Sequence, residues 1–579
     1  MRTTLLTLVI LGCATTPRAR PDAPPIQWQS WSRQSFEAAR AQGRHLLVSV
    51  QASWCHWCHV MNDETFGDAE VRRLVDEGYI AIKVDSDARP DLAERFQDYA
   101  WPATVLLSPD AEVVVAMRGY RAPEAFGQIL RDVRAGRAPR TDLGDAPTPA
   151  GLDDGLRVAR ASLDSLYDPE AHGWGRRQKY PYGAPIEHAF HRASVQGESE
   201  WGERASATLE GYAQLLDPVF GGAYQYSLRY GWTHPHYEKI AAVQADVLAS
   251  FARGALHTGD ARWLEHAENV RGYLERFFTS ERGGFFTSQD ADLSHEVTGE
   301  RYYAMDEEAR LALGVPRLDT AVYPHLNGRI IEALVLLHRA RPDDEAALRM
   351  AVRAAEHLES TRADDGLFPH GDQPLAYLAD QAWMLRGALA LHEATGDARW
   401  MQSATRTAEA MQALAHDEGG WYAHSEDPEA VGVFARRRRP TVDNAVAARA
   451  LIRLARLSGD DAYREHAVSA LQAVSGARSL RRLGRKVGEY VMALEELAAP
   501  YVLVSVVGPD DATTRALHGA AFRLSAPNRL VELGRPGQSR YPFPGEPAAY
   551  LCNAEACSVP VSDPDALAAA AVRFLDAAE

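Results

Sequence analysis

Three turns of nearly identical sequence recur between residues 257 and 467, and they constrain the fold of the chain more than any other feature. They read HTGDARWLEHA from His257, ATGDARWMQSA from Ala394 and LSGDDAYREHA from Leu457. The glycine of each turn can end one helix and the aspartate can cap the next. A glycine followed by an aromatic residue recurs as a second kind of turn, in HGWG, GGAY, GGFF, DGLF and GGWY. A repeat of about 60 residues with two kinds of turn predicts stacked helix pairs.

Counting apolar periods between these turns predicts six helix pairs in residues 151–499. Segments such as AAVQADVLASFARGAL and IIEALVLLHRA are apolar nearly all round, as inner helices packed on both sides must be. Six outer and six inner helices close into an (α/α)6 toroid. The predicted outer helices start near residues 152, 202, 261, 344, 398 and 460, and the inner helices near 186, 237, 327, 376, 442 and 486.

Polar side chains gather in the loops before the predicted inner helices, where a toroid has a bowl. Carboxylates among aromatic residues are typical of sites that bind or cleave sugars. Asp and Asn at helix starts also serve as caps, and aromatic residues after glycine pairs also fill cores, so both interpretations stay open. The predicted pocket residues are His234, His236, Glu238, Asp290, Asp292, Asn327, Asp380 and Asn444, with Tyr224, Phe285, Trp421 and Tyr422 between them.

Residues 26–138 precede the helical region and predict a second, α/β fold. A buried strand, HLLVSVQA, runs directly into CHWCHVMNDETF, so two cysteines stand at the start of a helix. A strand (YIAIKVDSD), a helix (RPDLAERFQDYA), two further strands (PATVLLSPD and EVVVAMRGY) and a closing helix (APEAFGQILRDVRAG) follow. This order is that of a thioredoxin-like domain.

The CxxC pair of this domain predicts thiol-disulfide chemistry. At a helix N-terminus, backbone N–H groups and the helix dipole stabilise a Cys55 thiolate, and Cys58 lies one turn away to resolve a mixed disulfide. His56 between them adds positive charge. Trp101-Pro102 fits the same arrangement, in which a cis proline would lie against the disulfide.

Other interpretations of the motif are weaker. With His59 the cysteines spell CxxCH, the c-type haem attachment signature, but that motif is expected in a small helical domain. Adjacent residues on one helical turn cannot all face one metal ion. We therefore predict no cofactor and no metal, although an inert structural disulfide stays open. Ser49 stands where thioredoxins carry a buried acid, so Asp63 or Glu64 would have to move protons.

The two ends of the chain carry separate signals. Residues 1–22 read as a secretory signal and tether, and the sequence ILGC makes Cys13 a candidate lipidation site. We expect an exported, periplasmic or membrane-anchored lipoprotein that contacts membrane only through this lipid. Residues 500–579 predict a small α/β region, in which Cys552 and Cys557 are candidates for a second disulfide or for exchange with the CxxC pair.

The charge of the chain argues against nucleic acid as a partner. The 62 basic and 79 acidic residues give a formal net charge of -17, which repels polyanions. The RRRR run at 436–439 is interpreted as a solvated loop or a rim of the bowl.

The motifs taken together resemble the spermatogenesis-associated protein 20 family. They are CHWCHVM, KVD followed by RPD, WPATVLL, HPHYEK, QDAD, LNG, the ATGD.RW turn and YLCNAEAC, and they span residues 27–560. The resemblance implies a thioredoxin-like domain followed by a six-hairpin, glycosidase-like toroid. Gln289 in QDAD replaces a glutamate of the family pattern, which counts against a two-carboxylate hydrolase.

The leading functional hypothesis is a thiol-disulfide oxidoreductase that acts on a protein thiol or disulfide partner, with a toroid that binds a glycan or a protein. The alternatives are a glycosidase- or epimerase-like enzyme with an accessory thioredoxin domain, and a non-catalytic binding protein.

Overall fold

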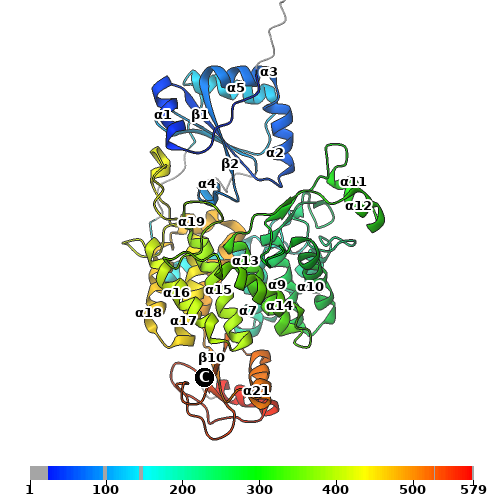
Figure 1. Ribbon diagram of the computed structural model, residues 1–579, viewed down its shortest axis with the longest axis vertical. Coiled ribbons are helices and arrows are strands. Elements are labelled where there is room, and N and C mark those ends of the chain that lie inside the picture. Colours follow the sequence, from blue (N-terminus) through cyan, green and yellow to red (C-terminus); the bar gives the residue numbers. More distant parts are fainter. Residues whose placement is uncertain (1–23, 96–100, 142–147, 527, 577–579) are drawn as a thin grey trace, which may run out of the picture.

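The computed structural model describes residues 24–95, 101–141, 148–526 and 528–576. The predicted signal and Cys13 lie outside the described residues. The described chain forms three parts in a row, with an α/β domain at one end, a helical toroid in the middle and a small α/β domain at the other end (Figure 1). No helix in these ranges is long and apolar enough to cross a membrane.

The first part has the predicted thioredoxin-like fold. Its sheet has the order β2-β1-β3-β4, with β1 and β2 parallel and the other neighbours antiparallel. One helix, α3, begins at an Asp68 cap and was not predicted. The elements are α1 (Arg33–Gln42), β1 (His45–Gln51), α2 (His56–Val60), α3 (Ala69–Gly78), β2 (Tyr79–Asp85), α4 (Pro90–Arg95), β3 (Ala103–Leu107), β4 (Val113–Arg118) and α5 (Pro123–Arg134).

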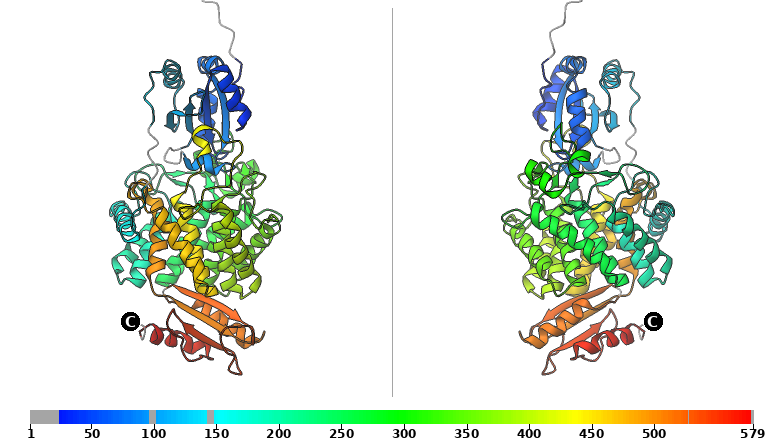
Figure 2. Two further views of the ribbon diagram at one scale, coloured as in Figure 1. Left: turned by 90° about the vertical axis from the view of Figure 1, so that its left-hand side faces the viewer. Right: turned by 90° about the vertical axis from the view of Figure 1, so that its right-hand side faces the viewer.

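The second part is the predicted (α/α)6 toroid. The inner helices touch in the closed order α7, α9, α13, α15, α17, α20 and back to α7, and each packs against an outer helix. The helices of the toroid run roughly along the long axis of the molecule, between the two α/β domains (Figure 2). The inner helices are α7 (Gly183–Val195), α9 (Ala241–Thr258), α13 (Pro324–Ala340), α15 (Leu378–Thr395), α17 (Thr441–Ser458) and α20 (Gly488–Ala498). The outer helices are α6 (Leu152–Ser165), α8 (Ser199–Ala213), α10 (Ala261–Tyr273), α14 (Ala346–Glu359), α16 (Ala398–Ala410) and α18 (Asp461–Ala473).

Four inner helices carry a buried amide side chain in their first turn, and each amide holds a glycine-aromatic turn. Asn327 accepts from the Phe285 N–H (2.7 Å) and donates to the Phe285 carbonyl (3.1 Å). Asn444 makes the same pair of bonds to Trp421. Gln244 and Gln381 repeat the pattern on Ala223 and Phe368. Asn327 and Asn444 were predicted as pocket residues, but the structure gives both amides a scaffold role, because each is fully buried and bonded to backbone.

The third part is the small α/β region at the C-terminus. Strands β10 (Val502–Val507), β11 (Arg529–Gly534) and β12 (Ala548–Cys552) form a sheet of order β11-β10-β12, accompanied by α21 (Ala512–Arg523) and α22 (Leu567–Asp576). Cys552 and Cys557 form a disulfide next to this sheet. The toroid separates the domain that carries this disulfide from the thioredoxin-like domain that carries Cys55 and Cys58 (Figure 1), so direct exchange between the two pairs is not supported.

A loop of the toroid, residues 427–436, packs against the thioredoxin-like domain, and we call it the clamp segment. Its Phe434 is 3% exposed and joins the core of that domain, with its ring 4.6 Å from Trp31. Arg89 pairs with Asp427 of the clamp segment (3.0 Å). The two parts are therefore held by apolar burial as well as by polar contacts.

We expect Asn327→Ala to lower the free energy of unfolding by about 2–4 kcal/mol, because the Phe285 N–H and carbonyl lose their partner in a dry environment. Urea denaturation followed by tryptophan fluorescence measures the change. Gln412→Ala removes an exposed amide and should leave the midpoint unmoved. Equal midpoints for wild type and Asn327→Ala would contradict the scaffold role.

Candidate functional site

Three short strands bring acidic side chains of the toroid to the face that meets the thioredoxin-like domain. The strands are β7 (Lys239–Ile240), β8 (Ser288–Gln289) and β9 (Leu318–Asp319), and they pair in the order β7-β8-β9. Glu238 precedes β7, Asp290 and Asp292 follow β8, and Asp319 ends β9. The loops before and between the inner helices thus place four carboxylates beneath the CxxC segment.

The Cys55–Cys58 disulfide lies within this contact. Cys55 is the N-cap of α2, and its Sγ accepts from the Cys58 backbone N–H at 3.1 Å. The two cysteines, joined in a disulfide, are 4% and 1% exposed. They form a small buried cluster with Ala52 and Trp54. Trp101 of the same domain and Ile240 of the toroid pack against this cluster. The face of the domain that carries the disulfide is therefore covered by the toroid.

The two histidines of CHWCH each face an aspartate of QDAD. His56 Nδ1 donates to Asp292 Oδ2 at 2.5 Å, and His59 Nδ1 lies 3.8 Å from Asp290 Oδ2. The His56 backbone N–H donates to Glu238 Oε1 at 3.4 Å. His56, Asp290, Asp292 and Glu238, four of the predicted site residues, thus meet in one place.

The electrostatics of this cluster follow from its charge pairs. The hydrogen bond to Asp292 raises the pKa of His56 despite partial burial, so its charged form is favoured beside Cys55. Burial is the largest influence on Asp290 and raises its pKa to about 6. The pKa of Asp292 is lowered: burial is the largest single influence and opposes ionisation, but the hydrogen bonds from His56 and the Gly299 N–H, together with the charges of the two histidines, outweigh it. The neighbouring carboxyl groups of Asp290 and Asp292 therefore differ in proton affinity.

Two residues next to Cys55 make contacts that the sequence did not predict. Ser53 Oγ donates to Asp319 Oδ2 of the toroid at 2.8 Å. Trp54 Nε1 donates to Asp87 Oδ2 at 2.9 Å. Burial raises the pKa of Asp87 to about 7, with the Asp85 charge adding to the effect. Asp87, two residues after β2, thus places a partly buried carboxyl group beside the cysteine cluster, whereas Ser49 offers none. That position after the strand was the signal available in the sequence.

The acids proposed for proton movement, Asp63 and Glu64, are engaged elsewhere. Asp63 pairs with His295 of the toroid at 3.2 Å, and Glu64 accepts from the Tyr120 hydroxyl. The Trp101-Pro102 peptide bond is cis, which is the conformation expected from the resemblance.

Asp380 lies in a separate buried cluster with two histidines. Its carboxylate accepts from His325 Nδ1 (3.0 Å) and His370 Nδ1 (2.8 Å), and these contacts lower its pKa against the effect of burial. His370 Nε2 donates to the Asp87 carbonyl at 2.8 Å. The three side chains have the composition and spacing to hold a metal ion. In this arrangement they bond each other and tie the toroid to the loop after β2.

Several predicted pocket residues lie outside the contact. His234 is exposed and bonds Thr233. His236, in contrast, belongs to the contact: it bonds Glu238, stacks on Tyr226, and its ring centroid lies 6.2 Å from that of His56. The aromatic residues Tyr224, Phe285 and Trp421 are buried in the core. The guanidinium carbon of Arg437, in the RRRR run, lies 3.8 Å from the centroid of the Tyr422 ring.

Fold and site together define a protein in which a thioredoxin-like disulfide centre is docked on an α/α toroid. The chain is homologous to spermatogenesis-associated protein 20, which confirms the resemblance seen in the sequence. The human protein is 23% identical over 93% of this chain and 89% of its own length, and the mouse protein is 22% identical over 93% and 88%.

Further similarities concern the separate parts. The family Thioredox_DsbH, described as "Protein of unknown function, DUF255", matches residues 19–134. The thiol:disulfide interchange protein DsbD of Ralstonia nicotianae is 32% identical over 20% of each chain. Among solved structures, a D-mannose isomerase covers 60% of this chain and 96% of its own at 12% identity, with a TM-score of 0.46. The family 76 mannosidase Bt3792 of Bacteroides thetaiotaomicron covers 60% and 98% at 13% identity, with a TM-score of 0.44.

The raised pKa of His56 makes the contact between the two parts depend on pH. The bond to Asp292 stabilises the docked state fully below the unperturbed pKa of 6.5 and is lost as the pH rises through the raised value. The stability difference between wild type and Asp292→Asn should therefore be largest below about pH 6.5 and shrink toward pH 8. Thermal unfolding from pH 5 to 8 measures it. Asp132→Asn, in an exposed pair with Arg137, is the matched control, and a difference that grows with pH would contradict the assignment.

Phe434→Ala should weaken the docking of the thioredoxin-like domain on the toroid, because truncating a buried phenylalanine costs about 3–5 kcal/mol. The weaker contact should expose the disulfide. We expect reduction by a protein reductant, bacterial thioredoxin, to accelerate at least about tenfold, which corresponds to 1.4 kcal/mol of docking energy. Reduction by a small phosphine should change less. Phe220→Ala, buried in the toroid away from the clamp segment, is the control. Unchanged kinetics with thioredoxin would show that the clamp segment does not limit access.

Proposed function

We propose that this protein is a thiol-disulfide oxidoreductase whose working centre lies between its thioredoxin-like domain and its toroid. The observation that carries the proposal is Cys55 at the N-terminus of α2, in a disulfide with Cys58 and next to a His56 that Asp292 keeps charged. Helix N–H groups and an adjacent imidazolium both favour a thiolate at Cys55. The similarity to DsbD over 20% of the chain supports this chemistry.

The exchange runs through a mixed disulfide. With the pair oxidised, the thiolate of a substrate dithiol attacks Cys55 Sγ, the Cys55–Cys58 bond breaks and Cys58 leaves as a thiolate. The second substrate thiol then attacks the mixed disulfide, which releases Cys55 and leaves the substrate oxidised. Two electrons pass from the substrate to the cysteine pair, and the reverse sequence reduces a substrate disulfide.

Asp87 is the group we assign to proton movement in these steps. A carboxyl with a pKa of about 7 can both accept and donate a proton near neutrality. It bonds Trp54, which packs in the same buried cluster as both cysteines. Its role does not require the exposed acids Asp63 and Glu64.

Burial of both sulfurs restricts the partner. A folded protein cannot reach a disulfide that the toroid covers, so we propose a small thiol or an extended peptide segment as the direct partner. Export of the chain, with a lipid on Cys13, would place the reaction in an oxidising compartment where such disulfides persist.

A carbohydrate-processing activity is the second candidate. Asp290 with a pKa of about 6 next to an ionised Asp292 is the pattern of an acid and a base, and the stack of Tyr226 on His236 lies beside Glu238. In that case the turnover of a glycan would survive Cys55→Ser. The two functions are therefore separated by one substitution.

Cys55→Ser should abolish disulfide exchange, and Cys58→Ser should trap a mixed disulfide with the substrate. The measurement is alkylation and mass analysis of the purified chain across a glutathione redox series, where we expect a midpoint between about -120 and -270 mV. Cys557→Ser, which breaks the second disulfide, is the matched control and should leave exchange intact. Full exchange by Cys55→Ser would refute the proposed nucleophile.

A further inference from the structure

A cavity of about 540 Å³ lies at the end of the toroid opposite the disulfide. It is lined by residues of the inner helices and, from the small C-terminal domain, by Phe522, Ser525, Ala526, Asn528, Arg529 and Leu530. Its size falls within the range of small-molecule sites, about 300–1,000 Å³. It shares no residue with the site between the thioredoxin-like domain and the toroid.

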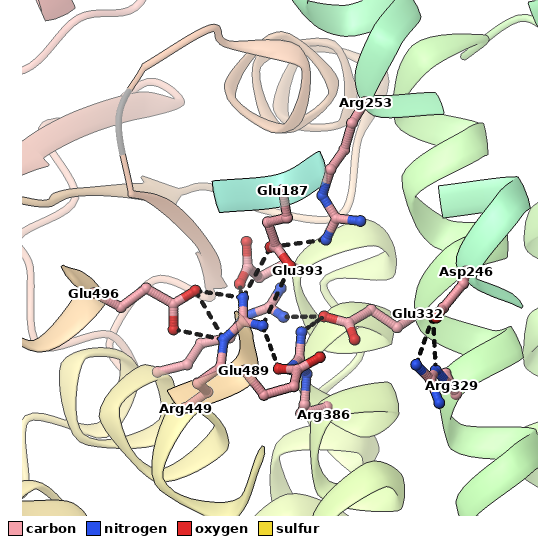
Figure 3. Close-up of polar contacts among 11 residues, drawn as sticks. Glu187, Asp246, Arg253, Arg329, Glu332, Arg386, Glu393, Arg449, Glu489 and Glu496 are labelled. Atoms are coloured by element: carbon pink, nitrogen blue, oxygen red, sulfur yellow. Dashed lines mark hydrogen bonds and ion pairs between the residues drawn. The ribbon is translucent and has the colours of Figure 1, made fainter. Parts of the chain in front are cut away.

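The wall of this cavity is rich in arginine, and a network of ion pairs crosses it (Figure 3). Arg449 bonds Glu187, Glu489 and Glu496, and Arg386 bonds Glu332. The arginines that line the cavity are Arg253, Arg339, Arg386, Arg449, Arg453, Arg456 and Arg529, whereas the carboxylates that line it are Glu187, Glu332 and Glu496.

Most of these arginines have partners within the protein. Arg253 pairs with Glu187 at 2.8 Å, and Arg453 with Glu393 at 2.6 Å. Arg456 donates to the Glu496 and Ala499 carbonyls at the end of α20, which is a favourable place for a cation.

Arg339 and Arg529 are the exceptions. Arg339 donates from Nη2 to the Leu524 carbonyl at 2.9 Å, and the Arg529 guanidinium lies 3.6 Å from its nearest carboxylate oxygen, on Glu393. Among the described residues, Arg339 Nε and Arg529 Nε and Nη1 are buried with no hydrogen-bond partner. The Arg529 side chain is 5% exposed. His191 Nε2, in the same wall, also lacks a partner.

Such donors are costly to leave unsatisfied. A buried cation without a bonded counter-charge destabilises a fold strongly. Burial lowers the pKa of both arginines, and the Arg339 charge lowers that of Arg529 further. Both guanidinium groups belong to residues that line the cavity, and a guanidinium is the side-chain group best suited to bind carboxylate or phosphate.

We infer that this cavity binds a small organic molecule through an oxyanion, a phosphate ester or a carboxylate, held by Arg339 and Arg529. Apolar side chains of the wall, among them Phe190, Leu336 and Phe522, are available to contact the uncharged part of the molecule. The proposal does not depend on the redox chemistry of Cys55.

The test uses the full chain and two probes, glucose 6-phosphate and glucuronate, in isothermal titration calorimetry at constant ionic strength. We expect one of them to bind the wild-type protein and to bind Arg339→Gln and Arg529→Gln at least about tenfold more weakly, since each loses a charged hydrogen bond. The probe that binds identifies the oxyanion as phosphate or carboxylate. Arg349→Gln on the exposed face of α14 removes the same charge and should bind normally.

Thermal unfolding without added probe provides a second readout. If Arg339 serves a ligand, Arg339→Gln should be as stable as wild type or more so in chloride buffer, because an unpaired buried charge is removed. It should also lose the stabilisation that the bound probe gives. Marked destabilisation of Arg339→Gln with unchanged probe binding would overturn the proposal, as would binding of neither probe at millimolar concentration.

Discussion

The buried amides at the starts of four inner helices fix the positions of the preceding loops relative to the toroid. Each amide occupies a position where a helix begins and fixes a glycine-aromatic turn that belongs to the preceding hairpin. These turns lead into the loops that carry the acids of the site. Because Gln244 holds Ala223 and Asn327 holds Phe285, the segments that end in Glu238 and Asp290 have little freedom to shift. The geometry around the disulfide therefore depends on hydrogen bonds that are remote from it.

The charge balance of the site is divided between two parts of the chain. The CHWCH segment supplies imidazoles and QDAD supplies carboxylates, so neither set is neutralised until the parts dock. A thioredoxin-like domain alone would present His56 to solvent. In this structure the hydrogen bond to Asp292 favours the protonated form of His56. The toroid thus acts on the disulfide as an electrostatic partner as well as a cover.

The sequence was a good guide to the fold, because the signals of the toroid are local. Gly259 takes the left-handed conformation and Asp260 caps the next helix, so a few residues determine each turn. The Asp68 cap of α3 was a similar local signal, although this helix was not predicted from the sequence. The site is different: His56 and Asp292 are 236 residues apart, and no local pattern shows that two domains meet there. Asn327 was assigned to a pocket because a helix-start amide looks the same whether it faces solvent or backbone.

The clamp segment has a consequence for the order in which the chain matures. Trp31 and Phe36 need Phe434 to complete their packing, yet Phe434 is synthesised roughly 300 residues after α5 ends. At translation rates of about 5–20 residues per second, the apolar surface that Phe434 covers stays exposed for on the order of 15 to 60 s. During that interval the cysteines of the first domain are accessible, so the disulfide can form before the toroid covers it.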